Sequence, residues 1–274
     1  MPIREEAQRN HDALFPNHAS TLKATDPELI ELFDNWAFDE VLKDGVLDTR
    51  TRLMVQLAAT IGCQAVNEYR IMLGAALHVG VTPVEAKEIV YQAVPYVGMA
   101  KVFDFLHVTN EVLRSRGVGL PLPEQSTTSP DTRFEKGLAI QKQILGDRID
   151  QLYAQSPEDE LHIQKHLSAN CFGDYYTRTG LDLKTRELLT FSMLASLGGC
   201  EPQLLGHVAA NLSVGNDRRV LLGTGAASLP GPLALEWIRR ATAGRSAARV
   251  QQEAALAEPA APRMWRVQAR PRRR

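Results

Sequence analysis

A glutamate, a thiol and an imidazole occur at suggestive spacings in the second half of the sequence. Glu187 precedes a glycine pair at 198–199, Cys200 follows that pair, and His207 lies seven residues further on. Gln203 and His207 are four residues apart and share a helical face, with Cys200 one further turn back, near the start of that helix. A break at the glycine pair can fold the helix of Glu187 back onto the same pocket. The pattern therefore predicts a proton-transfer site.

The chemistry of these side chains supports that prediction. A helix N-terminus favours the thiolate form of Cys200, and a histidine with a pKa near neutrality can pass a proton. Together with Glu187, they can perform general acid-base catalysis. The alternative is purely structural: His207 is a hydrogen-bonded histidine between helices, and Cys200 is a small core residue.

A second set of candidates lies in the first half. Arg70 can bind a carboxylate through two hydrogen bonds, while Glu68 orients a water molecule or a proton. His78 lies about two helical turns beyond Arg70. We expect these three residues, together with Gln203, to contact substrate. A surface or interface ion pair is the alternative role for Glu68 and Arg70.

The elements that must position these residues are helices. Apolar residues recur at three- and four-residue steps in several long windows, with no convincing alternating strand pattern, so the predicted class is all-α. A helix is expected to begin after Asp26, with a stripe of apolar side chains that predicts a core-facing surface. That stripe comprises Leu29, Leu32, Phe33, Trp36 and Ala37.

The two halves are similar to each other. Aligning Val79 with Val214 also matches Leu53 with Leu188 without a gap, and it places Glu68 opposite Gln203. We therefore expect two related helical repeats whose chemistry has diverged, joined by a segment rich in Gly, Pro, Ser and Thr. The predicted organisation is an N-terminal extension at 1–25, a first repeat at 26–116, a linker at 117–131, a second repeat at 132–217 and an Arg/Ala/Pro-rich tail at 218–274.

The tail no longer follows the pattern of the first half, so the second repeat is expected to be incomplete at its C-terminus. One hypothesis is an altered or out-of-frame terminus, and the alternative is a natural tail with short helices around 233–240. Its terminal arginine cluster lacks interleaved aromatic residues, and no known nucleic-acid-binding motif is recognisable, which argues against a nucleic-acid partner.

Composition and motif content exclude several classes of protein. No stretch approaches the roughly 18 apolar residues of a membrane span, and no signal peptide is evident, so we expect a cytoplasmic protein without a membrane partner. Three cysteines at irregular spacings argue against a disulfide framework. Metal-binding, phosphate-loop and dinucleotide motifs are missing, which predicts chemistry without a metal or cofactor.

Several motifs resemble the carboxymuconolactone decarboxylase family. They are Lys184-Thr-Arg-Glu-Leu-Leu-Thr, Gly199-Cys-Glu-Pro-Gln203 and Gly206-His207 in the second half, and Thr51-Arg-Leu-Met, Glu68-Tyr-Arg70 and Gln92-Ala-Val-Pro-Tyr-Val-Gly98 in the first. The resemblance implies a helical fold, homo-oligomers, and cofactor-free decarboxylation of a small carboxylated lactone in aromatic degradation. It also implies that Glu187 or His207 is the acid and that an arginine binds the carboxylate. Because pockets in repeated helical domains often form between subunits, we further expect Glu68 and Arg70 to complete a site containing His207 in a neighbouring chain.

The same superfamily leaves other functions open. Its alkylhydroperoxidases use two cysteines, and here Gln203 replaces the second, so disulfide cycling should be absent or impaired. A peroxidase or redox sensor that uses Cys200 alone is one alternative. A non-catalytic oligomeric binding protein is the other.

Overall fold

The computed structural model describes residues 2–16, 18 and 20–228, and within them the chain folds from helices without any strand. No helix in this described part is long and apolar enough to cross a membrane. The α-helices are α1 (Glu5–Leu14), α2 (Pro27–Asn35), α3 (Val41–Lys43), α4 (Thr49–Gly62), α5 (Val66–His78), α6 (Pro83–Val97), α7 (Met99–Ser115), α8 (Arg133–Leu145), α9 (Arg148–Gln155), α10 (Leu161–His166), α11 (Leu183–Leu197), α12 (Glu201–Ser213) and α13 (Arg218–Ala227). A short 3-10 turn, η1 (Thr21–Lys23), and two wider π-helical segments, η2 (Trp36–Glu40) and η3 (Leu167–Tyr176), complete the set.

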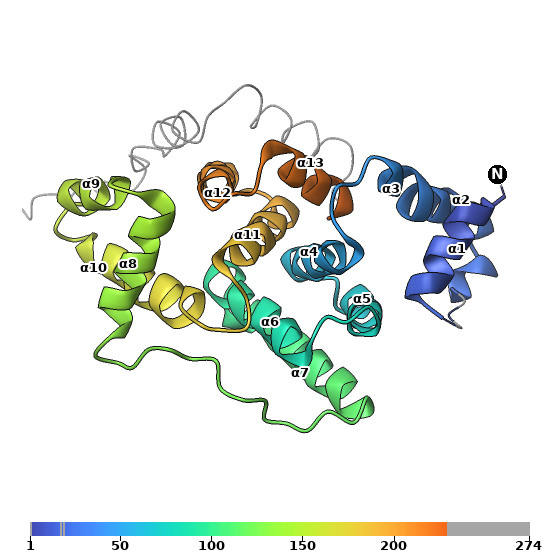
Figure 1. The fold of residues 1–274 in the computed structure, drawn as a ribbon, viewed down its shortest axis with the longest axis horizontal. Coiled ribbons are helices and arrows are strands. Elements are labelled where there is room, and N and C mark those ends of the chain that lie inside the picture. Colours follow the sequence, from blue (N-terminus) through green and yellow to red (C-terminus); the bar gives the residue numbers. More distant parts are fainter. Residues whose placement is uncertain (1, 17, 19, 229–274) are drawn as a thin grey trace, which may run out of the picture.

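The fold consists of two tandem helical repeats, as predicted. The register that aligns Val79 with Val214 also aligns α5 with α12 from end to end and the start of α6 with the start of α13. In Figure 1, α4 and α11 pack against each other near the centre, with α1 to α3 at one end of the molecule and α8 to α10 at the other. The two repeats thus share one core, which α4 and α11 build together.

A sharp chain reversal separates the paired helices in each repeat. Gly198 and Gly199 take φ values of 70° and 67° between α11 and α12, a backbone conformation that residues other than glycine rarely adopt. The equivalent turn between α4 and α5 places Gln64 at φ 61°. Because of this reversal, α12 packs back on α11, which positions the predicted site residues.

The N-terminal residues belong to the packed fold. Helix α1 packs on η2, and Arg4 donates a hydrogen bond to Asp39 at 2.8 Å. In the second half, α8 packs on η3, and Arg133 forms an ion pair with Asp174. Residues 1–25, which we expected to be an extension, therefore contribute a helix that packs on η2, as α8 packs on η3.

The prediction of a core-facing stripe on α2 is wrong. Leu29 is 60% exposed, Leu32 54% and Trp36 45%, whereas Ile30 and Asp34 are buried. Apolar periodicity identifies one face of a helix, but it does not say what covers that face. The stripe lies on the surface of this chain.

The last described helix falls in the segment that we assigned to the tail. Asp217 caps α13 by accepting a hydrogen bond from the backbone N–H of Val220 at 2.9 Å, and α13 packs on α4, α11 and α12. Helical structure of the second repeat therefore reaches Ala227. The helices expected around 233–240, and the question of an altered terminus, lie outside the described residues.

Candidate active site

The structure brings Glu187 and His207 into direct contact. Nδ1 of His207 lies 2.7 Å from Oε2 of Glu187, across the interface of α11 and α12. The Glu187 side chain is 1% exposed and that of His207 17%. Asn211 fixes the two helices beside this pair, because its amide donates to the carbonyl oxygens of Glu187 and His207 at 3.0 and 2.7 Å.

Aromatic and thiol side chains from other elements surround the pair. Tyr96, from α6 of the first repeat, packs with its ring centre 5.4 Å from that of His207, in an edge-to-face arrangement. Its hydroxyl lies 2.8 Å from that of Tyr176, and the Cys171 thiol donates to it at 3.7 Å. Tyr176 and Cys171 come from η3, a kind of helical irregularity that is frequent at functional sites. Both repeats therefore contribute to this site.

Burial sets the protonation of these neighbours. Desolvation raises the pKa of Tyr96 and of Tyr176 well above its usual range, with Cys171 and Glu187 adding to the effect. It also raises the pKa of Cys171 to about 12. All three groups are therefore neutral near pH 7 and can donate hydrogen bonds.

One polar atom in the site lacks a partner. Oε1 of Glu187 is buried and makes no hydrogen bond within the described residues. A buried carboxylate oxygen normally accepts hydrogen bonds, so this atom is suited to a bound molecule or a water. In the described part of the chain, no group of three or more His, Cys, Asp or Glu side chains is placed to hold a metal ion.

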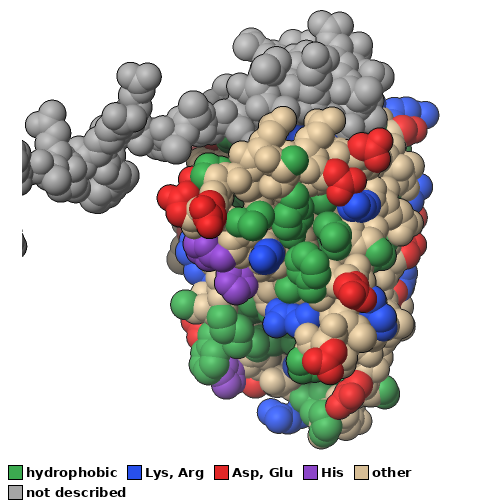
Figure 2. Space-filling model, turned by 90° about the vertical axis from the view of Figure 1, so that its left-hand side faces the viewer, with side chains coloured by type: hydrophobic (Ala, Val, Ile, Leu, Met, Phe, Trp, Pro, Cys, Tyr) green, Lys and Arg blue, Asp and Glu red, His purple; other side chains and the backbone are tan. Residues whose placement is uncertain are grey.

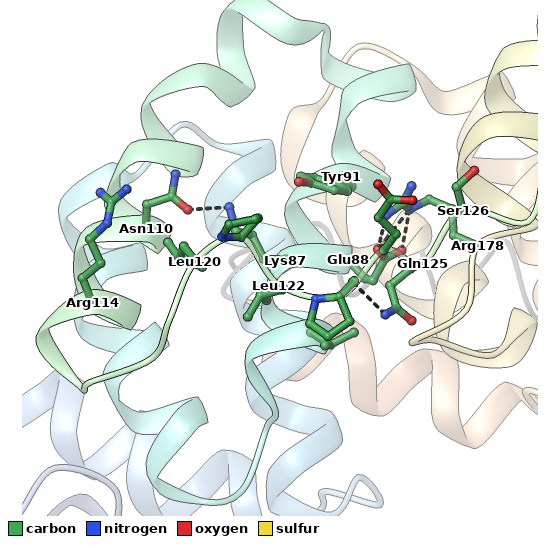
Figure 3. A pocket seen from close by; sticks show the side chains of 14 residues that line it. Lys87, Glu88, Tyr91, Asn110, Arg114, Leu120, Leu122, Gln125, Ser126 and Arg178 are labelled. Atoms are coloured by element: carbon green, nitrogen blue, oxygen red, sulfur yellow. Dashed lines mark hydrogen bonds and ion pairs between the residues drawn. The ribbon is translucent and has the colours of Figure 1, made fainter.

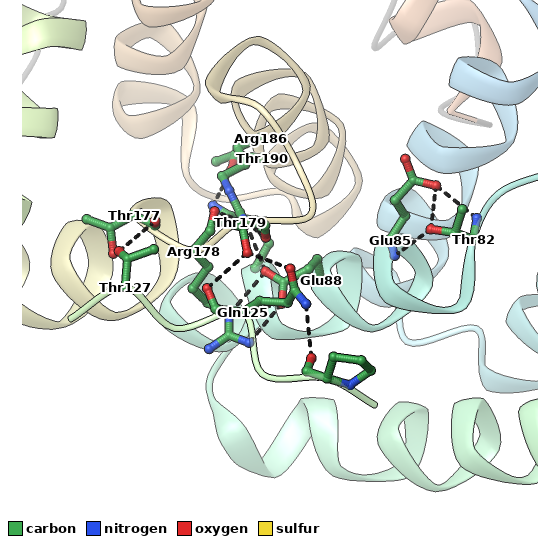
Figure 4. A network of polar contacts seen from close by, with 12 residues as sticks. Thr82, Glu85, Glu88, Gln125, Thr127, Thr177, Arg178, Thr179, Arg186 and Thr190 are labelled. Atoms are coloured by element: carbon green, nitrogen blue, oxygen red, sulfur yellow. Dashed lines mark hydrogen bonds and ion pairs between the residues drawn. The ribbon is translucent and has the colours of Figure 1, made fainter. Parts of the chain in front are cut away.

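A buried ion cluster supports the site from the first repeat. Glu88 on α6 binds two guanidinium groups: Arg178 through both carboxylate oxygens at 2.8 to 3.1 Å, and Arg186 through Oε2 at 2.9 Å. Figure 4 shows the three side chains converging. Arg186 is fully buried, and desolvation lowers its pKa against the opposing effect of Glu88. Both terminal nitrogens of Arg186 are thus engaged in contacts between the repeats, whereas its buried Nε makes no hydrogen bond within the described residues.

Hydrogen bonds connect this cluster to the aromatic side chains. Arg186 donates to Gln92 at 2.9 Å, Gln92 donates to Thr190 at 3.3 Å, and the Thr190 hydroxyl lies 3.2 Å from that of Tyr176. The chain of contacts therefore runs from Glu88 to the tyrosines that line the site.

The sequence analysis did not select Glu88, Gln92, Tyr96, Cys171 or Tyr176 as site residues. Glu88 and Gln92 are buried polar residues one helical turn apart in the apolar stretch 86–94. Two polar residues one helical turn apart in a largely apolar stretch are the signal that could have indicated a buried network.

Cys200 and Gln203 do not join the Glu187–His207 pair in the way we expected. The thiol of Cys200 donates to the carbonyl oxygen of Leu194 at 3.4 Å. Burial raises the pKa of the Cys200 thiol, and the charge of the nearby Glu201 raises it further. The prediction that Cys200 is a thiolate is therefore wrong. Gln203 is exposed at the start of α12.

The first-repeat candidates lie apart from one another. Arg70 forms an exposed ion pair with Glu111 of α7 at 2.7 Å, and His78 is exposed at the end of α5. Glu68 instead lines a cavity of about 560 Å³ beneath α1 and α2, and burial raises its pKa. The structure does not place these three side chains in one site.

The cavity of Glu68 occupies the place in the first repeat that the Glu187–His207 pair occupies in the second. In the shared register Arg52 corresponds to Glu187, and Met72 to His207, and both line this cavity. The acid and the imidazole are therefore found only in the second repeat at these equivalent positions.

Fold and site together define an all-helical tandem-repeat protein with a buried carboxylate-imidazole pair where its repeats meet. The chain belongs to the carboxymuconolactone decarboxylase family, whose sequence profile matches residues 27–111 and 162–224, more than half of the sequence. A protein from Burkholderia xenovorans, provisionally described as a gamma-carboxymuconolactone decarboxylase subunit, has a crystal structure of the same fold. It is 22% identical, with a TM-score of 0.50, and the match covers 91% of this chain and 95% of the other. No curated protein matches this sequence.

Proposed function

We propose that this protein decarboxylates a small carboxylated lactone without a cofactor, by proton transfer at Glu187 and His207 of the second repeat. The observation that carries the proposal is the 2.7 Å contact between Glu187 Oε2 and His207 Nδ1, at a fully buried carboxylate. A carboxylate held against one imidazole nitrogen orients the ring and stabilises its protonated form. Membership of the family supports this choice of reaction.

The proposed reaction needs one proton. The bond from the substrate to its carboxylate group breaks, carbon dioxide leaves, and the electron pair moves into the conjugated system of the lactone. A proton from the Glu187–His207 pair then bonds to carbon, and water restores that proton. Because Nδ1 of His207 is hydrogen-bonded to Glu187, Nε2 is the ring nitrogen that can deliver the proton to the substrate.

The substrate carboxylate requires a positive or hydrogen-bonding partner. Arg186 is already bound to Glu88 and Gln92, so the arginine that the family resemblance implies must come from elsewhere. We propose Arg70 of a second subunit, because its pairing with Glu111 is exposed and such pairs are weak enough to exchange.

Exposed apolar side chains support a homo-oligomer. The stripe on α2 is open in this chain, and Ile163 and Leu167 at the other end are 55% and 41% exposed. Figure 2 shows hydrophobic side chains gathered on the face that carries α8 to α10. Contiguous exposed apolar surface is typical of protein interfaces.

The redox alternative is less well supported. A single-cysteine peroxidase needs a thiolate, and burial raises the pKa of Cys200. Sulfenate formation at Cys200 on treatment with peroxide would revive that alternative.

The test is carbon dioxide release from γ-carboxymuconolactone by the wild-type protein and by Glu187→Gln and His207→Ala. We expect release by the wild type and a loss of about 10²- to 10⁴-fold in each variant, the usual contribution of general acid-base catalysis. Glu135→Gln, the same substitution at an exposed site on α8, is the matched control. No release by folded wild-type protein would refute the proposed substrate.

A further inference from the structure

A groove separate from the Glu187–His207 pair lies between α6, α7 and the segment that joins the two repeats. Its volume is about 710 Å³, within the range of small-molecule sites. Lys87 and Tyr91 face it from α6, and Asn110 and Arg114 from α7, as Figure 3 shows. Residues 120–126 form its outer wall.

The wall is held in place by the core of the protein. The backbone N–H of Thr179 donates to the carbonyl oxygen of Gln125 at 2.9 Å, and the Thr179 hydroxyl donates to the Gln125 side chain at 2.5 Å. Thr127 is fixed in the same way, through its hydroxyl to the Thr177 carbonyl at 2.9 Å. The groove is therefore built by tertiary contacts along the segment.

Positive charge at one end of the groove is uncompensated. Lys87 donates to the neutral side chain of Asn110, and within the described residues neither Lys87 nor Arg114 forms an ion pair. Desolvation, together with the charge of Arg114, lowers the pKa of Lys87. The acidic residue on the rim, Glu124, is exposed.

The other end is also positive. Arg178 and Arg186 share the single carboxylate of Glu88, so that cluster carries one net positive charge. Arg178 faces the groove and is 17% exposed.

Tyr91 separates the two charged ends. The Lys87 ammonium lies 5.9 Å from its ring centre and the Arg178 guanidinium 5.0 Å. In Figure 3, Lys87 and Arg114 lie on one side of Tyr91 and Arg178 on the other. A compact anion can meet one end only, whereas a molecule with two separated carboxylates can meet both.

We propose that this groove binds a small organic dicarboxylate, with one carboxylate at Lys87 and Arg114 and the other at Arg178. The carbon chain between them lies over Tyr91 and against Leu120 and Leu122. This proposal does not rest on the decarboxylation proposed above, because the groove shares no side chain with the Glu187–His207 pair and meets that site only through the Glu88 cluster, to which Arg178 belongs.

Calorimetric titration of the full chain with glutarate tests the proposal. We expect binding that weakens as salt is added, with pentanoate and inorganic phosphate each bound at least about tenfold more weakly, since each lacks one of the two anchors. Lys87→Gln and Arg114→Gln should each weaken glutarate binding to a similar degree. Lys101→Gln, on the exposed face of α7, is the matched control and should bind as the wild type does.

Four outcomes would contradict the proposal. Equal binding of glutarate and pentanoate, or unchanged binding in both Lys87→Gln and Arg114→Gln, would overturn the two-anchor site, and so would the absence of heat at millimolar glutarate. Glu187→Gln should bind glutarate as the wild type does, and a loss there would mean that the ligand occupies the Glu187–His207 site instead. Circular dichroism of each variant excludes misfolding as the cause.

Discussion

Replacement of Glu88 by glutamine is the sharpest test of how the two repeats are held together. The substitution preserves the shape of the side chain but removes the one negative charge that Arg178 and Arg186 share. Arg186 is 0% exposed, so its guanidinium group cannot be hydrated by solvent instead. Removing one partner of a buried ion pair costs about 3–5 kcal/mol, because the remaining charge stays buried without compensation. In a chain of this size, that loss should lower the melting temperature by roughly 10 °C.

The assay is thermal and urea denaturation followed by circular dichroism, at one fixed protein concentration. Glu111→Gln is the matched control, because it removes the same charge from the exposed pair with Arg70 and should cost less than about 1 kcal/mol. The double variant Glu88→Leu/Arg186→Leu should recover part of the loss, since it removes the two fully buried charges and leaves only Arg178, which is 17% exposed. A Glu88→Gln protein within about 1 kcal/mol of the wild type would refute the reasoning.

Two further predictions follow from close packing and from protonation. A methyl group on Gly137 would overlap the carbonyl oxygen of Ser168, so Gly137→Ala should destabilise the fold by more than about 3 kcal/mol. The control Gly206→Ala places its methyl group in open space within a helix, so its stability should be unchanged or higher by up to about 1 kcal/mol. Equal melting temperatures of the two variants would contradict this prediction. Because burial raises the pKa of Cys200, iodoacetamide should alkylate this thiol slowly at pH 7 in a Cys63→Ser background. The rate should still be rising above about pH 9. A rate that levels off below pH 8 would contradict the raised pKa.

The sequence was sufficient for local features whose partners lie nearby in the chain. The Gly198-Gly199 break and the position of His207 on its helix predicted that Glu187 and His207 could meet, because a helical reversal is a local event. The repeat register was also readable, since it depends on residue order alone. The expected stripe on α2 failed because periodicity shows which side chains align and not what packs against them.

The rest of the site could not be read from the sequence, because it depends on contacts across the repeats. Tyr96 meets Tyr176 across 80 positions, and Arg186 meets Glu88 across 98. Nothing in the local pattern of either segment specifies its partner. The same holds for the lowered acidity of Cys200, which arises from tertiary burial that outweighs the helix N-terminus.

The central claim is that Glu187 and His207 act as one proton-transfer unit, and a double-variant comparison tests it most directly. The measurement is kcat for carbon dioxide release from γ-carboxymuconolactone by wild type, Glu187→Gln, His207→Gln and the double variant. Residues that act as a unit give grossly non-additive losses, so the account predicts a double variant about as slow as the slower single variant. Losses that multiply, or either single variant with full activity, would contradict it.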